Sequence, residues 1–228
     1  MSDLADLEAF RGAWVTQRDI LTGRRYIDAL EASGEYSRAL EVCDEMWGLG
    51  FPSGRVDAAW IVKDRGDVER AITLMTEALP LQDEDDLPLL HGIIGHWRWH
   101  YLNDPRAETQ LLAGMLAYGT ARADLGHLMI ATGRPAEGRR VLQEGADDDT
   151  VECMLPLANL LSHDGDRDGA EAMYRRAIAL GDAHSAWNLA SDLLKEGRDS
   201  EAEELQWLAA SMGDEVAIAY LSSQHPDL

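Results

Sequence analysis

The sequence has few basic residues for its length. Lysine and arginine number 20 against 42 aspartates and glutamates, which gives a formal net charge of −22 over 228 residues. This charge opposes binding to the phosphates of nucleic acid and to anionic membranes, and it attracts basic proteins. We therefore expect a protein or peptide partner of basic character, and neither nucleic acid nor a membrane as partner.

Cysteine, proline and long apolar runs are also scarce. Cys43 and Cys153 are the only cysteines, they lie far apart among apolar positions, and we expect buried reduced thiols rather than a disulfide. No segment approaches the ~18 uninterrupted apolar residues of a membrane span, and the N-terminal residues lack the basic start of a signal peptide. With 46% hydrophobic residues and seven prolines, the sequence predicts a folded, cytoplasmic protein.

What the sequence does contain is a repeated turn. A glycine, or asparagine once, followed by a charged residue recurs about every 32 residues, with gaps of 32, 37, 30, 32 and 32, at Gly34, Gly66, Asn103, Gly133, Gly165 and Gly197. Because a fixed period of this length is typical of helical repeats, the whole chain is best interpreted in units of this turn.

Residues around each turn keep fixed positions. A small residue follows most turns by five positions, at Ala39, Ala71, Gly138, Ala170 and Ala202, with Ala107 one position early. Sixteen positions after four of the turns lies another glycine that we expect to end a second helix, at Gly50, Gly119, Gly181 and Gly213. Mostly apolar residues stand four and eight positions before each turn, which is the stripe of a first helix. Asp67 and Asp166 are expected to cap second helices.

This pattern resembles the tetratricopeptide repeat family from about residue 24 to residue 221. The last unit, with Trp187, Trp207 and Gly213, is similar to the Sel-like relatives of that family. The resemblance implies an all-α fold, a right-handed α-α solenoid of about six helix pairs with terminal capping helices. We expect an N-terminal capping helix in residues 1–22, a repeat array in 23–213, and a C-terminal capping helix and tail in 214–228.

Two irregularities interrupt the array. The 37-residue gap contains an acidic segment at residues 80–88, which we interpret as an insertion between helix pairs where the solenoid bends. Pro156 falls inside or near the start of a predicted first helix and is expected to delay or kink it.

The resemblance also implies a partner-binding groove lined by the first helices, at positions six and three before each turn. From those two rows, twelve residues in all, we select as candidate groove residues Asp28, Trp60, Lys63, Trp97, His100, His127, Asn159 and Ser191. Trp60 and Trp97 would serve as aromatic anchors, or they would fill the core. Leu155 stands where chaperone-binding relatives carry a clamp lysine, so an acidic peptide tail is not expected as ligand.

Motifs for catalysis or metal binding are incomplete. His96 and His100 are four residues apart on one helix face, but a third ligand would have to come from Asp64 or His127 on neighbouring units. The acidic run from Asp164 begins like a calcium loop, yet Arg175 occupies its twelfth position. Serine-hydrolase elbows, phosphate loops and dinucleotide fingerprints are missing, so we expect no enzyme, no catalytic residue, no cofactor and no metal.

Three hypotheses remain open at this point. The leading one is a non-enzymatic scaffold that binds a peptide or protein in the groove. The second is an acidic inhibitor or immunity-type protein that masks a basic partner. The third is a metal-dependent enzyme or metal-binding regulator centred on His96 and His100. Neither the partner's identity nor the oligomeric state follows from the sequence.

Overall fold

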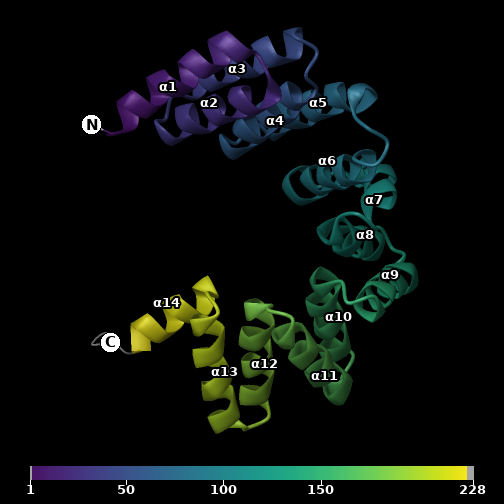
Figure 1. Ribbon diagram of the computed structural model, residues 1–228. Coiled ribbons are helices and arrows are strands. Elements are labelled where there is room, and N and C mark those ends of the chain that lie inside the picture. The colour runs from purple at the N-terminus through teal and green to yellow at the C-terminus, as the bar shows by residue number, and fades with distance from the viewer. Residues whose placement is uncertain (1, 225–228) are drawn as a thin grey trace. The chain divides into compact units, whose positions relative to one another are not determined.

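The computed structural model describes residues 2–224, and over this range the chain is helical without any strand (Figure 1). The α-helices are α1 Ser2–Gln17, α2 Ile20–Ala32, α3 Tyr36–Gly48, α4 Ser53–Asp64, α5 Val68–Ala78, α6 Leu87–Leu102, α7 Glu108–Gly114, α8 Gly119–Ala131, α9 Pro135–Asp147, α10 Val151–His163, α11 Arg167–Ala179, α12 Ala183–Lys195, α13 Asp199–Ser211 and α14 Glu215–Gln224. Two short 3-10 helices, η1 Leu79–Leu81 and η2 Pro105–Ala107, precede α6 and α7. The predicted all-α repeat fold is confirmed.

Contacts divide the chain into two compact units, Met1–Gly114 and Met115–Leu228. Unit 1 contains α1 to α7, and unit 2 contains α8 to α14. Within each unit, successive helices pack against one another as helix pairs in chain order (Figure 1). The acidic segment at 80–88 therefore lies inside unit 1, after α5, and its last two residues begin α6.

The repeated turns adopt the left-handed conformation that the sequence indicated. All six turn residues have positive φ, from +48° at Asn103 to +89° at Gly66. A residue without a Cβ adopts this conformation cheaply, and asparagine tolerates it better than most others do. Each first helix therefore ends where the sequence predicted.

The predicted ends of the second helices are right in three places and wrong in one. Gly50, Gly181 and Gly213 have positive φ after α3, α11 and α13. Gly119 instead begins α8, because α7 is short and already ends at Gly114. After α9 the same left-handed position is filled by Asp149, with φ of +60°, which a search for glycine misses.

Helix starts follow the expected capping chemistry. Asp67 accepts a hydrogen bond from the Arg70 amide at 3.2 Å, and Asp166 accepts one from the Gly169 amide at 3.1 Å. Pro156 does not delay its helix, because α10 begins at Val151 and runs through the proline. Among residues 2–224, we find no helix that combines the length and apolar character needed to cross a bilayer.

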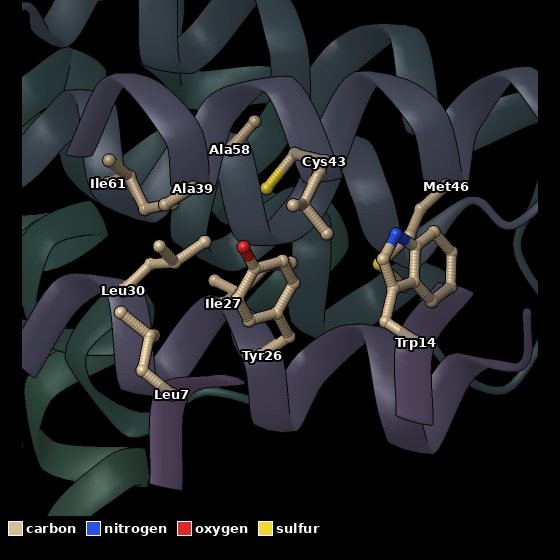
Figure 2. Close-up of a cluster of buried hydrophobic side chains, with 11 residues drawn as sticks. Leu7, Trp14, Tyr26, Ile27, Leu30, Ala39, Cys43, Met46, Ala58 and Ile61 are labelled. Atoms are coloured by element: carbon tan, nitrogen blue, oxygen red, sulfur yellow. The ribbon is translucent and has the colours of Figure 1, made fainter. Parts of the chain in front are cut away.

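The core of unit 1 begins with α1, which covers the first helix pair. Leu7 and Trp14 pack from α1 onto Tyr26 and Leu30 of α2 and Met46 of α3 (Figure 2). The indole of Trp14 also donates a hydrogen bond to Glu45 at 3.0 Å. α1 thus buries the side of the first pair that a preceding repeat would otherwise cover, although it ends at Gln17 and α2 already begins at Ile20.

The helix pair of α6 and α7 is held by contact between their backbones. A Cβ added to Gly114 would lie 2.2 Å from the Cα of Gly92 and 2.8 Å from the Pro88 carbonyl oxygen. Before α6, residues Asp83 to Asp86 form an exposed acidic turn. Unit 1 therefore departs from the simple repeat at its last pair.

Unit 2 keeps the small buried residues that the repeat predicted. Gly138, Ala170 and Ala202 are all buried where second helices meet first helices. An added Cβ at Gly138 would stand 2.4 Å from the Gly126 carbonyl oxygen, so α8 and α9 approach closely there. Asp214 caps α14 by accepting a hydrogen bond from the Ala217 amide at 2.8 Å. The predicted C-terminal tail at 225–228 lies outside the described residues.

Candidate functional site

The first helices α2, α4 and α6 of unit 1 carry five of the eight predicted groove residues. Asp28 is exposed on α2, Trp60 and Lys63 lie partly exposed on α4, and His100 is exposed on α6. We call this surface the first-helix face of unit 1, defined by Asp28, Glu31, Asp57, Trp60, Lys63 and His100.

The prediction that Trp97, the fifth of these residues, lines the groove is wrong. Its side chain is only 1% exposed and packs in the core, whereas Trp60 is 39% exposed. The two rings meet edge to face, with centroids 4.9 Å apart. The buried ring of Trp97 therefore packs against the ring of Trp60, and Trp97 itself has almost no surface available for contact with a partner.

Carboxylates are crowded on the first-helix face of unit 1. Burial raises the pKa of Glu31, and the negative charges of Asp28, Asp64 and Asp57 raise it further. Burial likewise raises the pKa of Asp57, although Arg24 opposes the shift through hydrogen bonds of 3.1 and 3.2 Å. The face thus holds more negative charge than its own cations neutralise.

Lys63 of α4 connects α4 with α6 on this face. Its ammonium lies 2.9 Å from a carboxylate oxygen of Asp64, 5.6 Å from the centroid of Trp60 and 5.7 Å from that of Tyr101. Asp64 also raises the pKa of Lys63, so the lysine stays charged. A cation beside two aromatic rings is stabilised by the negative charge on the faces of those rings.

His96 and His100 of α6 lie together as the spacing predicted, with ring centroids 5.1 Å apart. Arg98, between them in sequence, pairs with Asp104 at 3.2 Å. Over the part of the chain that the structure describes, no group of three or more His, Cys, Asp or Glu side chains is placed to hold a metal ion. The metal hypothesis therefore lacks its third ligand there.

The first-helix face of unit 2 has a different character. His127 and Asn159 are exposed on α8 and α10, and Ser191 is half-buried on α12, where its hydroxyl donates to the Trp187 carbonyl oxygen at 3.1 Å. Asn159 accepts hydrogen bonds from the Tyr174 hydroxyl at 2.6 Å and from the Asn188 amide at 3.3 Å. Asn159 and Ser191 thus have hydrogen-bond partners within unit 2.

A pocket of about 270 Å³ lies between α10, α11 and α12, beside this network. Asp192 in its wall accepts hydrogen bonds from Ser162 at 2.6 Å and from Lys195 at 2.7 Å. Burial raises the pKa of Tyr174 to about 12, with a smaller contribution from the charge of Asp192. The phenol therefore stays protonated as a hydrogen-bond donor.

Neither cysteine is suited to nucleophilic chemistry. Cys43 and Cys153 are both free and fully buried, as the sequence predicted. Burial raises the pKa of the Cys43 thiol strongly and that of Cys153 to about 12. Both thiols therefore remain protonated near neutral pH.

Sequence reasoning missed several residues that shape these faces. Asp57 stands one helical turn before Trp60, so a search along α4 at helical spacing would have found it. Tyr174 belongs to a second helix, α11, and reaches the face only through its contact with Asn159. Nothing in the repeat pattern indicates that contact.

Comparisons with known proteins identify the same kind of helical repeat. Residues 119–144 and 150–181 each match a tetratricopeptide repeat family model. Among solved structures, a Sel1 repeat protein from Oxalobacter formigenes is similar, with 16% identity and a TM-score of 0.61 over 86% of this chain and 87% of that one. A comparison with proteins of curated function finds no match.

Two further structures extend the likeness. The C-terminal part of a TPR repeat-containing protein from Cytophaga hutchinsonii has 12% identity and a TM-score of 0.59, covering 96% of this chain and 94% of its own. The APC/C hetero-tetramer Cut9-Hcn1 has 12% identity and a TM-score of 0.64, covering 96% of this chain but 46% of its own. Identities this low show a shared fold.

The fold and the repeat geometry define a class, the α-helical repeat proteins, in which stacked helix pairs form extended surfaces. Within that class, residues 119–144 and 150–181 match tetratricopeptide repeat family models, and the likeness to the Sel1 repeat protein is one of fold.

Proposed function

We propose that the chain works without catalysis and binds a basic segment of a partner protein on the first-helix face of unit 1. The observation that carries this proposal is the crowding of carboxylates beside an exposed tryptophan. Glu31 and Asp57 already have raised pKa values in the free protein. A bound lysine or arginine relieves that repulsion, while its aliphatic stem lies on Trp60.

Fluorescently labelled peptides rich in lysine and arginine test this proposal directly. We expect the double variant Asp28→Asn, Glu31→Gln to weaken binding about tenfold at low ionic strength, since each lost charge pair is worth ~0.5 to 1 kcal/mol. Asp83→Asn, Glu84→Gln is the matched control, because it removes the same charge from the same unit at the exposed acidic turn. Equal affinity of wild type and the Asp28, Glu31 variant would refute the proposal.

The same pair of variants separates this function from charge masking. An inhibitor that covers a basic protein with its overall acidic field responds to net charge wherever that charge lies. Masking therefore predicts equal losses for the two double variants, whereas binding on the face predicts a loss for one of them. Peptides in which glutamate replaces the basic residues should not bind in either case.

A further inference from the structure

A second surface of interest lies at the far end of unit 2, away from the polar network on Asn159. Helices α12, α13 and α14 surround an open pocket of about 280 Å³. Leu221 forms its buried part, while Leu194, Trp207 and Tyr220 stand around it with 45%, 41% and 39% of their surfaces exposed. We call this feature the terminal pocket.

Three large apolar side chains gathered in one depression are unusual on a strongly acidic surface. Each exposes area whose burial is worth ~25 cal/mol per Å². The volume is slightly below the ~300 to 1,000 Å³ of pockets for drug-sized ligands, so the terminal pocket has room for one or two side chains. Tyr220 is held in place by an edge-to-face contact with Trp187, at a centroid distance of 5.3 Å. The pocket is therefore preorganised.

Two carboxylates, Asp199 and Glu203, border this pocket, and they differ in ion pairing from the nearby Glu201. Glu201 on the same helix pairs with Arg198 at 2.6 Å. Asp199 and Glu203, which line the pocket, form no ion pair with any other residue in the described range. An apolar depression beside two carboxylates that have no ion-pair partner is complementary to an apolar side chain flanked by cations.

We propose that the terminal pocket binds a segment of another protein that inserts a leucine or phenylalanine between flanking arginines or lysines. A second copy of this chain is a poor occupant, because it would bring the same two carboxylates, Asp199 and Glu203, to the interface. The inference is independent of the first-helix face of unit 1, since every residue that carries it belongs to unit 2.

The experiment uses the full chain carrying Asp28→Asn and Glu31→Gln, so that binding on unit 1 does not obscure the result. Short labelled peptides with a central phenylalanine between arginines are titrated and followed by fluorescence anisotropy. Matched peptides replace the phenylalanine by serine, or the arginines by glutamate. We expect Leu194→Ser, and separately Asp199→Asn, Glu203→Gln, to weaken binding of the first peptide about tenfold.

Leu112→Ser and Asp83→Asn, Glu84→Gln serve as controls, since they remove an exposed leucine and two exposed carboxylates from unit 1. All of these variants alter exposed positions and should keep the wild-type thermal transition. The proposal is overturned if no peptide binds, if the serine and phenylalanine peptides bind alike, or if the controls weaken binding as much. It is also overturned if sedimentation shows a dimer that Leu194→Ser dissociates.

Discussion

Both units are built from packed helix pairs, but the spacing between successive helix starts is regular in unit 2 and irregular in unit 1. In unit 2, α8 to α14 begin at 119, 135, 151, 167, 183, 199 and 215, so each start follows the last by 16 residues. In unit 1, α2 to α6 begin at 20, 36, 53, 68 and 87, with intervals of 16, 17, 15 and 19. Both family-model matches fall in unit 2. The family models thus match the unit in which the helix starts are evenly spaced, rather than the unit in which the intervals vary.

The two first-helix faces differ as well. Unit 2 joins Asn159, Tyr174 and Asn188 in one hydrogen-bond network. Unit 1 leaves Asp28, Glu31 and Asp57 to repel one another beside Trp60. Repulsion of this kind lowers the stability of the free protein and is relieved when a cation binds, which supports the proposed binding of a basic segment on unit 1.

The largest expected effect concerns the tryptophan pair of unit 1. Trp97→Ala should destabilise the protein by about 4 kcal/mol, because it empties a buried indole site, whereas Trp60→Ala should cost about 1 kcal/mol. Urea unfolding measures both. Cys43 and Cys153, one buried thiol in each unit, report which unit opens when labelling is followed by mass spectrometry. We expect Trp97→Ala to accelerate labelling of Cys43 more than that of Cys153, and equal costs for the two tryptophans would contradict the core assignment.

Glycine substitutions compare the close approaches in the two units. Gly114→Ala should cost about 3 kcal/mol, because its Cβ would meet backbone atoms of Gly92, which cannot move alone. Gly126→Ala in unit 2 should cost less, about 2 kcal/mol, because its Cβ would come closest to the buried side chain of Leu142 rather than to backbone atoms. Gly12→Ala, with open space around the site, is the reference. Thermal and urea unfolding measure the loss of stability in each variant. A smaller loss for Gly114→Ala than for Gly126→Ala would show that the backbones of α6 and α7 can move apart.

The polar network of unit 2 is tested by removing one hydroxyl. Tyr174→Phe should destabilise the protein by about 1 kcal/mol, since the partly buried hydrogen bond to Asn159 is lost without a change in shape. Tyr36→Phe in unit 1 is the control, because that hydroxyl has no hydrogen-bond partner among the described residues. Similar unfolding free energies for both variants would show that the network does not stabilise unit 2.

The smallest expected effect is a difference in sign between the units. Glu31 has a folded-state pKa above its ordinary 4.5, so its ionised form opposes folding at neutral pH. Glu31→Gln should therefore raise stability at pH 7 by a few tenths of a kcal/mol, and the gain should vanish as pH falls below 4.5, where both states are protonated.

Glu171 in unit 2 provides the opposite case. Arg198, with Arg175, lowers its folded-state pKa below 4.5, so its ionised form contributes stability above that pH and loses it as pH falls through the folded value. Glu171→Gln should lower stability at pH 7 by a few tenths of a kcal/mol. Urea unfolding from pH 4 to pH 7 measures both variants, and shifts of the same sign would contradict the contrast between the units.

Much of the fold was predictable because its turns depend on local chemistry. A glycine with positive φ ends a helix whatever lies around it, so the turn period located all six first-helix ends. Prediction failed where another residue took the same conformation, as Asp149 does, and where a helix was shortened, as at α7. For the candidate site, the repeat positions selected Asp28, Trp60 and Lys63 on one face, but gave no means to tell Trp60 from Trp97.

The sequence alone thus determined the helical class, the turn period and the acidic charge, since each follows from residue type and spacing along the chain. The tertiary structure decided that Trp97 is buried beneath Trp60, and that Glu201 is paired while Asp199 and Glu203 are not. Burial and ion pairing depend on which helices meet in space. Residues at equivalent repeat positions therefore have different surroundings, and only contacts between helices assign each one to core, network or binding surface.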